Sequence, residues 1–182
     1  LSHNSNKLLS LSNDLYETEN FKEVGGVGEP ISVGTHCMEV GHRLGDFWGL
    51  KSVGVDKDGF VLVQVSDGNG GWNVKPFNTN LNKEENRQRL GNGLPKIYAG
   101  WGNTFRYKGF DLNLQFTGQF GYQILNAQRS FYENNSIAYN RLKSAADWHP
   151  AINADGTPVM DVATGKQKMV RLSNSMSQGI WS

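Results

Sequence analysis

The stretch that decides the fold is "FDLNLQFTGQF", residues 110–120, in which apolar and polar residues alternate. Counted from Phe110, every second residue is aromatic, leucine or glycine. The residues between them are polar, and after Asp111 they carry no charge. Such alternation predicts a β-strand with one apolar face and one polar face. The stretch is about twice as long as an ordinary globular strand of about 5–6 residues, so its length needs a physical explanation.

A second alternating stretch precedes the first one directly. Residues 96–107 are joined to Phe110 by Lys108-Gly109. A connection of two residues with glycine in the second place is typical of a primed β-turn. The sequence therefore predicts a hairpin over residues 96–124, with Tyr107 opposite Phe110 as the first pair.

This register places the side chains of both strands in two sets. We expect the apolar set to face lipid, and it comprises Trp101, Phe105, Phe110, Leu112, Leu114, Phe116 and Phe120. We expect the polar set to face a water-filled lumen, and it comprises Tyr98, Thr104, Arg106, Asp111, Asn113, Gln115, Thr117 and Gln119. Asn103, opposite Leu114, interrupts the apolar set. Arg106 opposite Asp111 is a favourable cross-strand pair, and we expect it to be structural.

The length of the hairpin indicates that lipid surrounds its apolar face. From Phe110 to Phe120 an extended chain spans roughly 33 Å. Tilted by about 40°, it covers roughly 25 Å, the height of the apolar band of an outer-membrane barrel. Aromatic residues lie at both ends, as in the girdles of such barrels. The alternative is a long hairpin of a soluble β protein, but a polar face of amides and hydroxyls favours a wet lumen.

Composition narrows the classes of protein. The chain has 182 residues, a net charge of +1 and 22 glycines, which favours β structure and loops and gives no sign of a nucleic-acid surface. The single Cys37 excludes an internal disulfide. Cys37 stands between His36 and His42, but a metal site needs further ligands. We expect an ordinary loop cysteine and no metal.

The rest of the chain is expected to be mainly loop, and the whole to be part of a longer polypeptide. Residues 1–11 are predicted to be the end of a strand, and residues 12–95 mostly an extracellular loop with a small hairpin at Ser52–Val65. Residues 125–182 are predicted to be a second such loop containing a helix at Asn126–Asp147. The apolar stripe of that helix would comprise Phe131, Ala138, Leu142 and Ala145.

Catalysis is not expected. The candidate acids mostly stand in turn motifs such as "DKDG" and "ADGT", and they are Asp56, Asp58, Asp67, Asp147, Asp155 and Asp161. Turn chemistry accounts for aspartates in these places. The sequence contains no nucleophile elbow and no phosphate-binding loop. We predict no catalytic residues and no cofactor.

The stretch "GNGLPKIYAGWGNTFRYKGFDLNLQFTGQFGYQILN", residues 91–126, resembles the SusC/RagA-type TonB-dependent outer-membrane transporters. The matching positions are Pro95-Lys96, Asn103-Thr104-Phe105, Tyr107-Lys108, Phe110-Asp111-Leu112, Gly118, Gly121 and Asn126. Weaker similarities to the same family lie at residues 2–11, 40–59 and 147–158. The chain departs from the family at His42-Arg43, where proline is usual. It also departs at "SDGNGG", where Asp67 and Asn69 offer too few oxygens for a calcium ion.

The resemblance implies a fold and a function. The chain would be part of the C-terminal half of a 22-stranded barrel, in a Gram-negative outer membrane, with the plug domain outside these residues. It implies energised import of oligosaccharides or peptides, with TonB and a SusD-like surface lipoprotein as partners. Exposed aromatic residues of the outer loops would contact substrate or lid, and the candidates are Trp48, Trp72, Tyr132 and Trp148.

Two alternatives remain open for the function and for these aromatic residues. In the first, the chain as a whole is a secreted or surface β-rich module that binds carbohydrate without transport. In the second, each of the tryptophans Trp48, Trp72 and Trp148 packs beneath its own hairpin instead of contacting substrate or lid.

Overall fold

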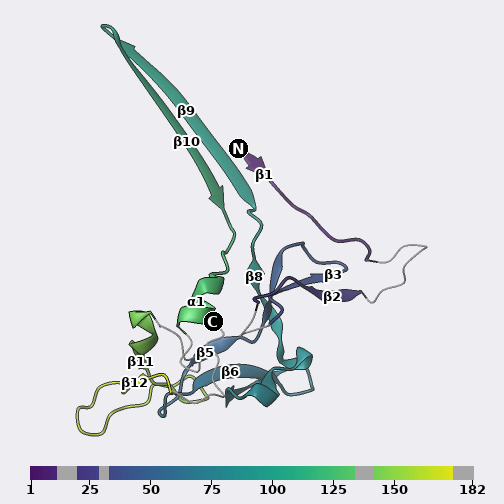
Figure 1. The fold of residues 1–182 in the computed structure, drawn as a ribbon, viewed down its shortest axis with the longest axis vertical. Helices are drawn as coiled ribbons and strands as arrows, with labels where there is room; N and C mark the ends of the chain where they lie inside the picture. The colour runs from purple at the N-terminus through teal and green to yellow at the C-terminus, as the bar shows by residue number, and fades with distance from the viewer. Residues whose placement is uncertain (12–19, 29–32, 134–141, 174–182) are drawn as a thin grey trace. The chain divides into compact units, whose positions relative to one another are not determined.

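The fold is mainly β, and its sheets are antiparallel. A computed structural model describes residues 1–11, 20–28, 33–133 and 142–173 (Figure 1). No helix among these residues is long and apolar enough to cross a membrane. The chain divides into two compact units, which are described separately. Unit 1 comprises Leu1–Gly25, Thr35–Phe47 and Gly91–Leu125, and unit 2 comprises Gly26–Gly34, Trp48–Leu90 and Asn126–Ser182.

The dominant element of unit 1 is the long hairpin of β9 (Ile97–Tyr107) and β10 (Phe110–Phe120) (Figure 1). Its two strands pair residue for residue, from Tyr107 opposite Phe110 to Ile97 opposite Phe120. The predicted hairpin and its register are therefore confirmed. The strands are slightly shorter than residues 96–124, because Gly121 has a φ of 75° and ends β10.

The turn of this hairpin has the predicted primed geometry. Lys108 has a φ of 45° and Gly109 a φ of 85°, so both residues are left-handed. This conformation matches the twist of the flanking strands. Glycine adopts it without cost, whereas lysine does not. Lys108 Nζ lies 5.2 Å from the centroid of the Tyr107 ring.

A short strand lies beside the start of β9. β1 (Ser2–His3) pairs antiparallel with it, with Ser2 opposite Tyr98 and His3 opposite Ile97 (Figure 1). The predicted strand at residues 1–11 is thus confirmed only at its beginning. Further on, the Leu8 N–H donates to the His42 carbonyl at 2.9 Å, which holds this segment to a loop instead of a sheet.

A four-stranded sheet has the order β2-β3-β4-β8. Its strands are β2 (Phe21–Val24), β3 (His36–Glu39), β4 (Asp46–Gly49) and β8 (Gln88–Asn92). Cys37 lies in β3 with 1% of its surface exposed, so the prediction of a loop cysteine was wrong. The strand was not recognised because it has only four residues, His-Cys-Met-Glu, in which polar and apolar residues do not alternate.

Unit 2 contains a second sheet of three strands, β5 (Ser52–Val55), β6 (Val61–Ser66) and β7 (Trp72–Pro76). The predicted small hairpin is confirmed as β5 and β6. Its turn is closed by the Asp56 carboxylate, which accepts the N–H groups of Asp58 and Phe60 at 2.9 and 2.8 Å. β7 was predicted to be loop, because its polar residues hide the strand signal.

The core of unit 2 is built around β6. Alternate residues of this strand pack with Leu50 and Phe77 in one buried cluster, and they are Val61, Val63 and Val65. A second cluster joins Val55, Ala151 and Val170. Two single helical turns, η1 (Thr79–Leu81) and η2 (Glu84–Asn86), follow β7. β11 (Trp148–Pro150) and β12 (Met169–Arg171) form a two-stranded ribbon.

The helix predicted at Asn126–Asp147 was wrong in its extent. The structure has α1 (Ala127–Tyr132) and a separate turn, η3 (Lys143–Ala146). The Leu142 N–H donates to the Tyr132 carbonyl at 2.8 Å, whereas a continuous helix would hold these residues about 15 Å apart. Ala138 of the predicted stripe lies outside the described residues.

The β6 cluster predicts a sensitive position. Phe77→Ala empties a buried site with 4% exposure and is expected to lower the free energy of unfolding by about 3–5 kcal/mol. Urea unfolding at equilibrium measures it. The fully exposed Val162→Ala is the control and should change stability by less than about 0.5 kcal/mol. Equal effects of the two substitutions would show that Phe77 is not a core residue.

The turn of the long hairpin predicts a second sensitive position, Gly109. Gly109→Ala places a Cβ on a left-handed residue and is expected to cost about 1–2 kcal/mol of folding free energy. Outside Gly109 and its two chain neighbours, no heavy atom lies within 4 Å of the position that this Cβ would take, so the cost comes from backbone conformation. Lys108→Asn is the matched control, since asparagine tolerates this conformation, and it should be neutral or stabilising. A stable Gly109→Ala variant would contradict the assigned turn.

Candidate functional site

The long hairpin carries the most unusual surface of the chain, an apolar face without a protein cover in the described residues. The exposed fractions of Phe110, Phe116, Leu112 and Trp101 are 81%, 59%, 53% and 52%. Phe105 and Phe120 are also exposed, and Leu114 is half-buried. Because directly opposed residues of an antiparallel pair share a face, the confirmed register places all seven predicted apolar residues on one side of the hairpin.

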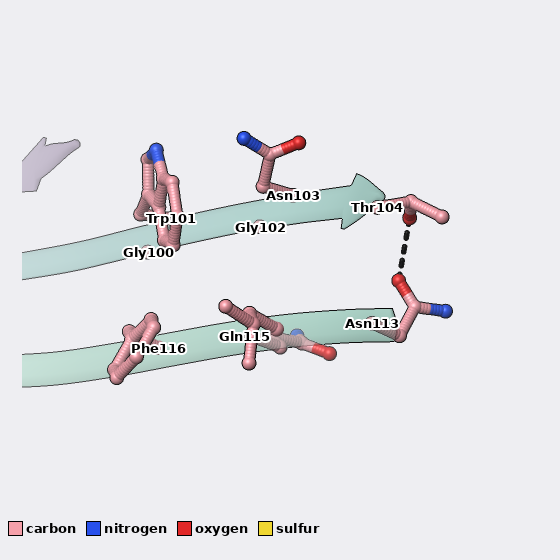
Figure 2. A pocket seen from close by; sticks show the side chains of 9 residues that line it. Gly100, Trp101, Gly102, Asn103, Thr104, Asn113, Gln115 and Phe116 are labelled. Carbon is pink, nitrogen blue, oxygen red and sulfur yellow. Dashed lines mark hydrogen bonds between the residues drawn. The ribbon is translucent and has the colours of Figure 1, made fainter. Parts of the chain in front are cut away.

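Aromatic rings fill this face. The Trp101 and Phe116 rings lie opposite each other with their centroids 5.5 Å apart (Figure 2). At the far end, the Phe120 ring covers Gly118, since a Cβ there would lie 2.8 Å from the ring. The result is a mainly hydrocarbon surface, which the Asn103 amide interrupts.

The opposite face is polar and has no net charge. Thr104 Oγ1 donates to Asn113 Oδ1 at 2.5 Å, and the two side chains point toward each other in Figure 2. Arg106 Nε lies 3.3 Å from Asp111 Oδ1, as the sequence predicted. The remaining cross-strand pairs are Gln115 with Gly102, Thr117 with Gly100, and Gln119 with Tyr98. The two charges cancel, so this face offers hydroxyls and amides to its surroundings.

A shallow groove of about 370 Å³ lies over the middle of the hairpin. Its lining comes from both strands and comprises Gly100, Trp101, Gly102, Asn103, Thr104, Asn113, Leu114, Gln115 and Phe116 (Figure 2). A Cβ on Gly100 or Gly102 would have its nearest neighbour, a backbone oxygen, at 3.9 Å. The space beside both glycines is therefore open, because no side chain fills the polar face at these two positions.

The four aromatic residues predicted to contact substrate or lid lie in unit 2, on four different elements. Trp48 on β4 is half-buried, with the Arg89 guanidinium carbon 6.0 Å from its ring centroid. Trp72 on β7 and Tyr132 at the end of α1 are exposed. Trp148 on β11 is 58% exposed, and the guanidinium of Arg171 lies 4.8 Å from its ring centroid. Their contact with substrate or lid stays a prediction.

A buried carboxylate escaped the sequence analysis. Glu133, at the end of α1, accepts a hydrogen bond from Ser144 Oγ at 2.6 Å and one from Arg129 Nε at 2.8 Å. The Ser144 hydrogen bond, followed by the Arg129 guanidinium, lowers the pKa of Glu133. Arg129 and Glu133 are four residues apart, a spacing from which the sequence could have predicted an ion pair on a helix. Ser144 reaches Glu133 only because the chain folds back so that Leu142 contacts Tyr132, and no local sequence pattern predicts this contact.

The candidate acids take part in turns. Asp56 caps its turn as described above, and Asp67 accepts the N–H groups of Asn69 and Gly71 at 2.8 Å each. These two donors lower the pKa of Asp67. Hydrogen bonds from neighbouring residues also lower the pKa of Asp155, through Thr157, and of Asp161, through Thr164 and Ala163. Asp58 lies 3.6 Å from Lys57, and Asp147 follows η3.

Metal ligands do not gather in the part of the chain that the structure describes. No group of three or more His, Cys, Asp or Glu residues there is placed to hold an ion. His36, next to Cys37, has other contacts, since its Nδ1 is hydrogen-bonded with Thr35 Oγ1 at 2.8 Å and its ring centroid lies 5.0 Å from that of Phe47.

Comparison of the chain with protein-family models, with curated proteins and with solved structures finds no match. The function of the hairpin is therefore inferred from its own geometry.

Glu133 gives a pH-dependent prediction. Its pKa is lowered from 4.5 in the fold, so the carboxylate stabilises the fold above that pH, and this contribution is lost as the pH falls through the lowered pKa. Ser144→Ala removes the largest cause and should reduce the loss of stability on acidification. Urea unfolding between neutral pH and pH below 4.5 compares the variant with the parent chain. The exposed Ser5→Ala should leave the pH dependence unchanged, and an identical profile for Ser144→Ala would contradict this assignment.

Proposed function

We propose that this chain is part of an outer-membrane β-barrel that imports nutrients, with β9 and β10 as a membrane-crossing hairpin. The observation that carries the proposal is the two-sided exposure of this hairpin over eleven residues in each strand. A surface of this apolar character is costly in water, at about 25 cal/mol per Å². Hydrocarbon solvates it without that cost.

The dimensions support lipid as the solvent of the apolar face. Ten residue steps of β10, tilted as in known barrels, match the roughly 25 Å apolar band of an outer membrane. Tyr107 and Phe110 lie at the turn end of the hairpin, and Phe120 and Tyr122 at the other. Rings of this kind are enriched at both membrane interfaces. A short turn at one end and long connections at the other are also usual in these barrels.

The polar face supports a wet interior on the other side. Its hydroxyls and amides bind water or polar ligands, and its single ion pair leaves no net charge. In the proposed importer this face lines the lumen through which an oligosaccharide or a peptide passes. The exposed Trp72, Tyr132 and Trp148 of unit 2 belong to outer loops, where they contact substrate or a SusD-like lipoprotein lid. TonB supplies the energy through a plug domain outside these residues.

A charge on the apolar face tests the proposal. Leu114→Arg near the middle of β10 is expected to destabilise the barrel by roughly 2–4 kcal/mol, because an ionised group would face hydrocarbon. Gln115→Arg is the matched control, since the next residue faces the lumen and should tolerate the same side chain. Heat-modifiable mobility of the full-length protein, extracted from outer membranes with detergent, measures the folded fraction.

The outcome separates the importer from its main alternative. A secreted carbohydrate-binding module would dissolve without detergent and would bury Leu114 against protein. Equal tolerance of arginine at Leu114 and Gln115, or a full-length protein that stays in solution without detergent, would refute the membrane assignment.

A further inference from the structure

The edge of β9 that faces β1 is open along most of its length. In the sheet β1-β9-β10, β10 pairs with all of β9, whereas β1 reaches only Ile97 and Tyr98. From Ala99 to Tyr107, no strand among the described residues lies on that side. An open edge of this length is a template for a further strand.

The hairpin geometry identifies the backbone groups on this edge. A two-residue loop makes Tyr107 and Phe110 a hydrogen-bonded pair, and bonding then alternates along the strands. Alternate residues of β9 therefore direct their N–H and C=O groups away from β10, and they are Gly100, Gly102, Thr104 and Arg106. Before β9 the pattern is not yet regular, since the Lys96 carbonyl accepts the Asn4 N–H at 2.9 Å on the β1 side while the Lys96 N–H donates to the Phe120 carbonyl of β10 at 3.0 Å.

The register of β1 determines where a further strand would lie. Ser2 is opposite Tyr98 and His3 is opposite Ile97, so Leu1 comes opposite Ala99 on the apolar face. Each earlier residue of the same polypeptide then advances one position along β9. The first residue before Leu1 would face Gly100, the sixth would face Phe105, and the eighth would face Tyr107.

We propose that the stretch of the same polypeptide before Leu1 continues β1 as a strand along β9 to Tyr107. The proposal rests on the proposed function, because backbone groups without a hydrogen-bond partner are costly in lipid, whereas in water they are hydrated. It specifies a side-chain pattern. The second, sixth and eighth residues before Leu1 are apolar or aromatic, since they stand opposite Trp101, Phe105 and Tyr107. The first, third, fifth and seventh are polar or glycine, since they share the lumen face.

A second copy of the chain is a poorer occupant. β1 already covers the start of the edge in antiparallel direction. A strand from another copy would have to end at Leu1 or displace β1. Continuation of β1 needs no rearrangement of the paired residues.

Paired cysteines in the full-length polypeptide test the register. Phe105→Cys is combined with cysteine at the sixth residue before Leu1, which the proposal places directly opposite it. Directly opposed residues of an antiparallel pair lie within disulfide distance, so oxidation should cross-link most chains internally. The matched control moves the second cysteine to the fourth residue before Leu1, on the same face but roughly 7–8 Å away, and should give little product.

The outcomes are distinct. A cross-link in the offset pair only, a cross-link between two copies, no cross-link in either pair, or a polypeptide that begins at Leu1 would each overturn the proposal. Chains that carry only Phe105→Cys and the buried native Cys37 show the background. Cross-linking of the matched pair in a protein that is soluble without detergent would support the strand and refute the importer, so the two failures are distinguishable.

Discussion

The hairpin depends on uninterrupted backbone pairing between β9 and β10. Eleven residues of each strand stand opposite one another without a bulge, and this pairing alone determines which side chains share a face. Few tertiary contacts support it, since both faces are largely exposed in the described residues. An isolated two-stranded hairpin is marginal in water. The long hairpin therefore needs either further strands at its edges or a non-aqueous environment for its apolar face, and a membrane barrel supplies both.

Unit 2 obtains its stability in a different way. Its three-stranded sheet buries Val61, Val63 and Val65 of β6 in an ordinary protein core, together with Leu50 and Phe77. A second cluster ties Ala151 and Val170 to Val55. This cluster lies next to β11, which carries the exposed Trp148.

The predictability of each part follows the range of the interactions that form it. The hairpin was predicted down to single pairs, because alternation and a two-residue turn determine register locally. The β5–β6 hairpin was predicted from its "DKDG" turn and the apolar run that follows it. β7 was missed because its polar residues hide the strand signal, although it pairs with its neighbour β6. The strands of the sheet that contains Cys37 were missed because each has only four or five residues. The helix at Asn126–Asp147 was overextended, since its spacing pattern could not show that Leu142 returns to Tyr132. Glu133 was missed for the same reason.

The bulge-free alternation of β9 and β10 also limits how this region can diverge among related chains. Deleting one residue within either strand would move every later side chain of that strand from the polar face to the apolar face, or the reverse. Length variation in the hairpin should therefore occur in steps of two, matched on both strands. Single-residue insertions and deletions should accumulate in the connections outside it, such as the turn-rich excursion between β11 and β12.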